Sequence, residues 1–138
     1  MKASLLAKLV AISLAAGSLA LARTGTAAAP VDWSSAQRVE IRMIEYEIVP
    51  DQLRFTRGLP YQLHIVNAGK EGHDFTAPDF FASVELRDAG VLDERRSSLF
   101  LQSQEIADIY FVASSQGLFA PRCADHDWAG MTATIVVD

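Results

Sequence analysis

Cysteine is almost absent from this sequence of 138 residues, which contains only Cys123. A single cysteine cannot form a disulfide within its own chain, so the fold is stabilised without one. Four roles remain for the thiol: a buried inert side chain, a bridge to another molecule, a reactive nucleophile or a metal ligand. The sequence around Cys123 indicates which of these four roles applies.

Long apolar runs are missing everywhere except near the N-terminus. A short basic region ends at Lys8, and residues 9–22 are uncharged and rich in Leu and Ala. This run is shorter than the about 20 apolar residues that span a membrane, and it has the length of the hydrophobic core of a secretory signal. We therefore predict an export signal over residues 1–29 and a mature domain over residues 30–138.

Small residues after the apolar run provide sites for signal cleavage. The best site is Ala27-Ala28-Ala29, just before Pro30, and residues 20–22 are the second choice. An uncleaved N-terminal anchor is the alternative. With cleavage, we expect a protein of the bacterial periplasm that has no stable membrane insertion.

Basic residues are scarce in the mature domain. Residues 1–29 hold three of the 12 basic residues and none of the 17 acidic ones, so nine basic residues remain against 17 acidic ones, a net charge of −8. Nucleic acid is therefore excluded as a partner, because the phosphate backbone requires clustered Lys and Arg. A protein with a basic surface would be attracted instead.

Helical periodicity and internal repeats are also lacking after Pro30. The roughly 109 mature residues suffice for one hydrophobic core but not for two. Apolar residues alternate with polar ones in short runs that are separated by turn residues, which predicts an all-β fold, a two-sheet antiparallel Greek-key β-sandwich. The runs cover residues 39–48, 53–55, 61–66, 106–112, 118–122 and 132–137.

Two places depart from this strand pattern. The apolar positions of the first run change parity between Met43 and Ile44, which predicts a β-bulge there. Residues 78–104 have no clear period, and we expect a short helix around Phe80 and Phe81 or an irregular segment.

The most informative segment lies between the last two predicted strands. Two residues separate Cys123 from His126, and four separate His126 from Met131. A loop whose ends are fixed by strands can direct a thiol, an imidazole and a thioether to one centre. Two His and one Cys in a trigonal arrangement, with a long axial Met, form the blue-copper site. One further His is therefore needed.

His73 and His64 are the two candidates for that ligand. His64 lies inside a predicted strand, whereas His73 follows the turn residues 67–69 and belongs to a loop. Binding residues lie preferentially on loops at the end of a rigid scaffold. We therefore choose His73 and expect His64 to be a surface or core-edge residue.

In this layout the sequence resembles the small blue copper proteins, the cupredoxins such as plastocyanins, pseudoazurins and amicyanins. The resemblance rests on an early His after a strand that ends in Asn, on Gly117-Leu118-Phe119, and on the final loop with its Cys, His and Met. It implies a cupredoxin-like sandwich with one Cu(I)/Cu(II) ion, bound by His73, Cys123, His126 and Met131, and used for outer-sphere electron transfer.

Three positions differ from the usual pattern of these proteins. Pro121 replaces an aromatic residue, Asp125 replaces a Pro, and Asp74 stands where plastocyanins tend to have Asn. Trp128, within the ligand loop, either caps the site or belongs to a docking surface. These differences concern the surroundings of the ligands and not the ligands themselves.

The function that we predict is single-electron transfer by a monomeric copper protein that is not an enzyme. A redox protein such as a c-type cytochrome, an oxidase or a reductase, with a basic docking face, is the expected partner. A copper carrier or delivery protein is the alternative, since it would use the same four residues. An enzyme with a Cys/His nucleophile pair or an open copper site is the third reading.

Overall fold

The computed structural model describes residues 28–138, so the predicted export signal lies outside the described residues except for its last two. Ten strands, one short α-helix and three 3-10 helices make up the described part. The strands are β1 (Gln37–Ile44), β2 (Glu47–Val49), β3 (Gln52–Phe55), β4 (Pro60–Asn67), β5 (His73–Thr76), β6 (Val84–Leu86), β7 (Ser98–Leu101), β8 (Ile106–Ala113), β9 (Gly117–Phe119) and β10 (Thr134–Val137). The helices are η1 (Trp33–Ser35), α1 (Pro78–Ala82), η2 (Ala89–Val91) and η3 (Asp127–Ala129).

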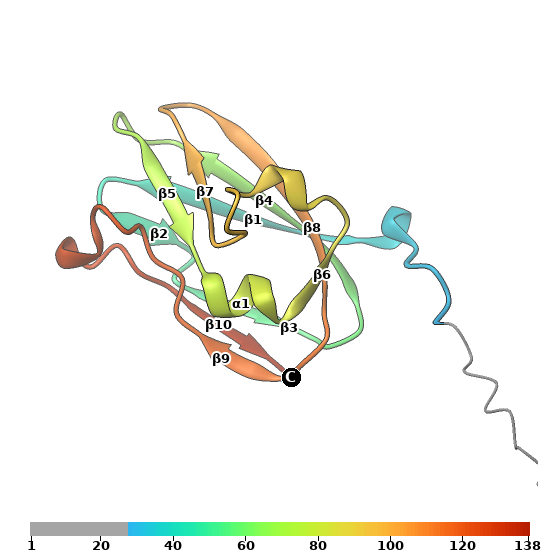
Figure 1. The fold of residues 1–138 in the computed structure, drawn as a ribbon. Coiled ribbons are helices and arrows are strands. Elements are labelled where there is room, and N and C mark those ends of the chain that lie inside the picture. Colours follow the sequence, from blue (N-terminus) through green and yellow to red (C-terminus); the bar gives the residue numbers. More distant parts are fainter. Residues whose placement is uncertain (1–27) are drawn as a thin grey trace, which may run out of the picture.

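The strands form a β-sandwich (Figure 1). One layer is a five-stranded sheet with the order β2-β1-β4-β8-β6. The other layer contains the three-stranded sheet β3-β10-β9 and the two-stranded sheet β5-β7. The predicted all-β sandwich is thus confirmed, and two of its pairings, β1 with β4 and β3 with β10, are parallel.

Alternating side chains fix the buried face of the central strands. In β4 every second residue is buried, beginning with Tyr61 and continuing through Leu63 and Ile65 to Asn67. Strand β8 presents Ile109 and Phe111 to the same core. A strand buries alternate side chains because successive residues point to opposite faces of its sheet.

The predicted bulge near Met43 and Ile44 is wrong. The chain turns at Glu45 and Tyr46, and β2 returns antiparallel to β1, with Ile44 opposite Glu47. The turn accounts for the change of parity, because each strand of the hairpin keeps its own alternation. As a result, Glu45 and Tyr46 lie in the turn between β1 and β2.

Residues 78–104 contain the predicted short helix together with two short strands. Helix α1 begins with a Pro at its first turn, a position that needs no backbone N–H. Its Phe80 and Phe81 are buried, as expected. Among residues 28–138, no helix has both the length and the apolar character required to cross a membrane.

Aromatic side chains fill the centre of the sandwich. The Phe111 ring makes edge contacts with Phe55 and Phe80, with centroid distances of 5.0 and 5.1 Å. Tyr61 stacks on Phe111 at 5.6 Å. Each aromatic pair of this kind adds about 0.5–1.5 kcal/mol to the effect of burial. The core therefore provides a rigid base for the loops at its end.

Candidate metal centre

Backbone hydrogen bonds close the loop that carries three of the predicted ligands. The Cys123 N–H donates to the Met131 carbonyl at 3.0 Å, so the first and last predicted ligands of the loop are backbone neighbours. Just before Cys123, Arg122 pairs with Thr76 at the end of β5 through two hydrogen bonds of 2.8 and 3.0 Å. This pairing joins the loop to the strand that begins with His73.

His126 lies at the start of a short helical turn inside the loop. It precedes η3, and its carbonyl accepts a hydrogen bond from the Ala129 N–H at 3.0 Å. The turn ends at Gly130, whose φ of 91° lies in the left-handed region that side chains disfavour. The chain can then reverse and bring Met131 back beside Cys123.

The expectation that His73 belongs to a loop is wrong, because His73 is the first residue of β5; its side chain is fully buried. The preceding loop is held by Asn67, which is itself fully buried at the end of β4. The Asn67 side-chain amide donates to the carbonyls of Glu71 and Leu101 at 2.8 and 3.0 Å, and its oxygen accepts from the Gly69 N–H at 3.0 Å. One side chain therefore fixes the loop before His73 against β7.

The structure brings His73, Cys123 and His126 together. The two Nδ1 atoms are 3.3 Å apart, and the Cys123 Sγ lies 3.4 Å from Nδ1 of His126 and 3.9 Å from Nδ1 of His73. These three separations define a point about 2 Å from each atom, close to the about 2.0–2.3 Å of metal bonds to imidazole and thiolate. The triangle therefore has the size of a metal site.

A carboxylate faces the outer nitrogen of each imidazole. Glu45 Oε1 lies 3.5 Å from Nε2 of the buried His73, and Glu71 Oε2 lies 3.4 Å from Nε2 of His126. At 3.5 Å the Glu45 contact is electrostatic rather than a hydrogen bond, and the His73 Nε2 has no hydrogen-bond partner among the described residues. Both carboxylates favour a hydrogen on Nε2, which leaves the Nδ1 lone pairs directed at the centre.

The turn of the β1–β2 hairpin is fixed above the His73 loop by Glu45. Its Oε1 accepts hydrogen bonds from the backbone N–H groups of Lys70 and Glu71, the second at 2.8 Å. The bond to Glu71 is the main reason that the pKa of the Glu45 carboxyl lies below its ordinary value. The carboxylate that faces His73 is therefore ionised at neutral pH.

These residues fit a soft metal ion. Two imidazole lone pairs and a sulfur converge in a region from which water is largely excluded, and a bound cation compensates their mutual repulsion. Thiolate and thioether donors select copper, and two His with one Cys form the trigonal base of a blue-copper centre. The cluster is consistent with a type 1 copper site.

Met131 is fully buried beside this cluster. Its carbonyl accepts the Cys123 N–H, and its own N–H donates to the His126 carbonyl at 3.4 Å. The backbone thus places Met131 next to both loop ligands. Its thioether remains the predicted fourth donor.

Asp74 contacts the thiol of Cys123. Its Oδ2 lies 3.3 Å from the Cys123 Sγ. Burial raises the pKa of the Cys123 thiol above its ordinary value, and the side chain of Asp74 adds to that increase. The thiol proton is therefore held in the metal-free protein and has to leave when a metal binds.

An aromatic pair covers His126. The Tyr46 ring lies 4.8 Å from the His126 ring, and Trp128 lies 6.0 Å from Tyr46. Tyr46 is 36% exposed and Trp128 is 77% exposed, whereas the His126 side chain is only 16% exposed. We call Tyr46 and Trp128 the aromatic cap. Trp128 was expected either to cap the site or to belong to a docking surface. This geometry is compatible with both roles, since the exposed aromatic cap lies over the cluster.

His64 is not part of the cluster. It lies in β4, and its Nδ1 is 2.7 Å from Asp108 Oδ1 on β8. The expectation of a residue at the surface or core edge agrees with this position. No sequence pattern predicted that Glu45, Tyr46 and Glu71 contact the cluster. They approach it because the hairpin turn and the His73 loop meet in space.

The unusual residues near the loop leave the cluster intact. Pro121 is buried outside β9, which ends at Phe119, and its carbonyl still accepts the Ala133 N–H at 2.9 Å. The strand edge is therefore irregular, as expected of a residue without an N–H. Asp125 is exposed beside His126 and makes the surface near the cluster more acidic.

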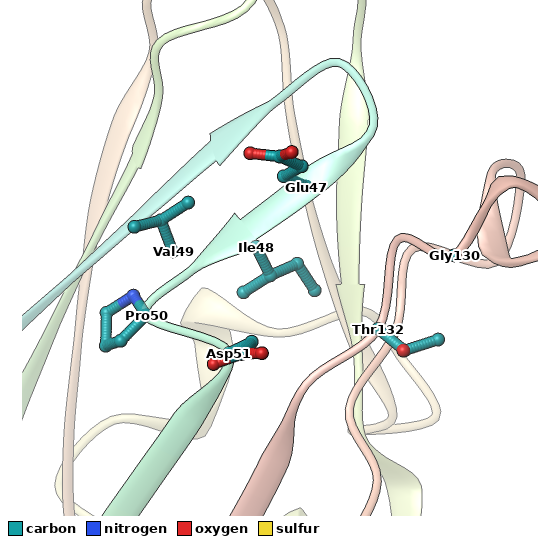
Figure 2. Close-up of a pocket in the computed structure, with 7 residues that line it drawn as sticks. All are labelled: Glu47, Ile48, Val49, Pro50, Asp51, Gly130 and Thr132. Carbon is teal, nitrogen blue, oxygen red and sulfur yellow. The ribbon is translucent and has the colours of Figure 1, made fainter.

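A pocket borders the far end of the ligand loop (Figure 2). It lies between β2 and the segment that continues from η3, and it contains no His or Cys. Figure 2 shows Ile48 pointing from β2 towards the Thr132 segment, with Val49 on the other side of the strand. The lining residues are Glu47, Ile48, Val49, Pro50, Asp51, Gly130 and Thr132.

The sequence matches no known family model and no curated protein. The fold is similar to solved structures of auracyanins. Auracyanin B has 19% identity and a TM-score of 0.57, and the similarity covers 78% of this chain and 93% of that one. A dithionite-reduced auracyanin from Roseiflexus castenholzii has 14% identity and a TM-score of 0.55, with coverage of 75% and 98%.

The architecture is therefore the cupredoxin β-sandwich, as the sequence predicted. At these identities the similarity shows the fold alone. The metal centre is inferred from the distances between the donor atoms of this chain.

Proposed function

We propose that this protein is a type 1 copper protein that transfers single electrons between redox partners. The observation that carries the proposal is the triangle formed by Nδ1 of His73, Nδ1 of His126 and Sγ of Cys123. A bound copper ion would supply a one-electron couple between Cu(I) and Cu(II). His73, Cys123, His126 and Met131 would hold it, with the thiolate and the thioether as the soft donors that select copper.

The rigidity of the donors favours electron transfer over catalysis or metal delivery. His73, Cys123 and Met131 are each fully buried, and the loops that hold them are joined by the Arg122–Thr76 pairing. Four protein donors leave no open position for a substrate, in contrast to catalytic metal sites. Buried ligands also disfavour exchange of the ion with a recipient protein.

The aromatic cap is the proposed entrance for electrons. Tyr46 covers the His126 ring, so a partner that contacts Tyr46 and Trp128 comes close to a ligand of the copper. Exposed aromatic side chains are also frequent at the centres of protein interfaces. The partner's redox group would thus approach through His126.

Acidic residues surround the cap and favour a partner with a basic face. Glu45 and Glu47 flank Tyr46, Glu71 contacts His126, and Asp125 is exposed in the loop. Arg122, in the same region, is paired with Asp127 at 3.2 Å. A c-type cytochrome, an oxidase or a reductase with a basic docking face is the proposed partner.

Export to the bacterial periplasm belongs to the same proposal. The mature protein would comprise residues 30–138 after cleavage of the signal over residues 1–29, and it would act as a monomer. The first described element, η1, begins just after this boundary, at Trp33. Mass spectrometry of the protein purified from periplasmic extract would test the cleavage site.

The absorption and paramagnetic resonance spectra of the copper-loaded mature protein test the function. We expect an intense visible band from thiolate-to-copper charge transfer. We also expect rapid reduction by a reduced cytochrome, and slow loss of Cu(I) to a chelator. A colourless copper complex contradicts the type 1 site, and fast loss of Cu(I) without electron exchange supports copper delivery instead.

A further inference from the structure

Each of the three side chains of the donor triangle is accompanied by a carboxylate. Glu45 faces the outer nitrogen of His73, and Glu71 faces that of His126. Asp74 contacts the sulfur of Cys123 itself. Of the three, Asp74 is the most buried, at 9% exposed, whereas the side chains of Glu45 and Glu71 are 25% and 53% exposed. The strongest electrostatic effect is therefore expected from Asp74.

The Asp74 carboxylate is held in one position. The Ala124 N–H donates to both of its oxygens, at 2.9 and 3.0 Å, and the Thr76 hydroxyl donates to Oδ1. Hydrogen bonds to an ionised acceptor are short and strong. Among the described residues, the group whose ligand atoms lie within 4.8 Å of one another comprises His73, Cys123 and His126, so Asp74 touches the thiol without joining the donor triangle.

We propose, on the basis of the proposed copper function, that Asp74 lowers the reduction potential of the centre. Its buried carboxylate makes the oxidised form neutral and the reduced form negative. In the oxidised form, the Cys123 thiolate and the Asp74 carboxylate together balance the two charges of copper(II). The two imidazoles and the thioether are neutral. Reduction by one electron from a reduced redox partner adds one negative charge to the centre and breaks no bond.

A neutral amide at position 74 would exchange which of the two redox forms carries a net charge. The oxidised centre would then carry one positive charge, and the reduced centre would be neutral. A net charge is costly in a buried region, because the polarisation of water that stabilises it is missing. Asp74 therefore favours copper(II) and lowers the reduction potential, which in blue-copper sites is tuned by the groups around the Cys sulfur.

The substitution Asp74→Asn tests this charge effect with little change of shape. The amide oxygen can accept the bonds from Ala124 and Thr76, so the loop geometry is retained. We expect the ratio of Cu(I) to Cu(II) at a fixed solution potential to rise at least tenfold. For a one-electron couple, a tenfold rise corresponds to an increase of about 59 mV in the reduction potential. Redox titration followed at the visible band measures it.

Glu85→Gln is the matched control. Glu85 is an exposed carboxylate on β6, the edge strand of the five-stranded sheet, and its removal changes the net charge of the protein by the same amount. The reduction potential of the Glu85→Gln variant should equal that of the wild type. An intact visible band with an unchanged potential in Asp74→Asn overturns the inference, as does an equal increase in Glu85→Gln.

A metal-free measurement separates this inference from the proposed function. Asp74→Asn should lower the pKa of the Cys123 thiol, which can be followed by the ultraviolet absorbance of the thiolate during a pH titration. A wild-type protein that forms no coloured copper centre overturns both proposals. A coloured copper centre whose reduction potential is unchanged in Asp74→Asn, together with an unchanged thiol pKa in the metal-free variant, overturns this inference alone.

A second variant applies if Asp74→Asn does not fold, which far-ultraviolet circular dichroism of the metal-free protein would show. Thr76→Val removes a hydroxyl that partly neutralises the carboxylate, so the ratio of Cu(I) to Cu(II) should fall several-fold. A ratio that stays the same or rises in this variant contradicts the role assigned to Asp74.

Discussion

The side chains of the candidate centre are fixed in orientation before any metal binds. Carboxylates select the Nε2–H tautomer of both imidazoles, and Asn67 holds the loop that leads to His73. Cys123 is the donor whose chemistry can be replaced with the smallest change of shape. Its sulfur is also the group on which an intense visible band depends.

Cys123→Ser should abolish the visible band of the copper-loaded protein. A hydroxyl of similar size replaces the thiol, but it is a hard and weakly acidic donor that gives no thiolate-to-copper charge transfer. The absorption spectrum of the copper-loaded variant measures the effect, and the thermal unfolding of the metal-free variant checks the fold.

His64→Gln is the control for this substitution. His64 pairs with Asp108 on the strand surface and lies outside the donor triangle, so its loss should leave the copper spectrum unchanged. If the band persists in Cys123→Ser, or disappears in His64→Gln, the assignment of the ligands is wrong.

At the scale of elements, the ligand loop depends on one residue with a left-handed backbone. Gly130 ends η3 with a φ of 91°, and nothing lies within 4 Å of the position that a Cβ would occupy. The cost of a side chain there is therefore backbone strain alone. Gly58, in the turn between β3 and β4, has a φ of 81° and the same open surroundings.

Gly130→Ala and Gly58→Ala form a matched pair of variants. Each should lower the free energy of unfolding by about 1–2 kcal/mol, because the left-handed conformation costs a residue with a Cβ about that much. Only Gly130→Ala should also weaken copper binding or shift the visible band, since its turn carries His126 and Met131.

Urea unfolding of both metal-free variants and competition with a Cu(I) chelator measure these two effects. Equal stability losses with a change of copper affinity in Gly130→Ala alone are expected. An equal change of affinity in both variants would mean that the loop geometry does not control the site.

At the scale of the whole molecule, charge determines how a partner approaches. The predicted mature domain carries a net charge of −8. Acidic residues flank the aromatic cap, so the field of the whole domain and that of the proposed docking face have the same sign. Long-range attraction between opposite charges increases association rates and is screened by salt.

The rate of electron exchange with a basic c-type cytochrome should fall at least tenfold between about 0.01 and 0.15 M salt. Stopped-flow measurement of cytochrome oxidation gives the rate. A small uncharged oxidant is the control, and its rate should vary little with salt. If the rate with the cytochrome is independent of salt, docking is not electrostatic.

Local sequence patterns were sufficient for much of the fold. Alternation predicted most of the strands, because each strand has one buried face. The pattern was misleading at Glu45 and Tyr46, where a turn and a bulge produce the same change of parity. It also gave no indication of the parallel pairings, since strand order depends on connections between distant segments.

The sequence by itself determined that a thiol, an imidazole and a thioether share one short loop, and that a second His begins a segment after a turn. Spacing along the chain sets these relations. Only the tertiary structure decided that Asp74 contacts the sulfur, that Glu45 faces His73 and that Tyr46 covers His126. These contacts join residues that are far apart in the chain, and their distances follow from how the sheets pack and not from any local pattern.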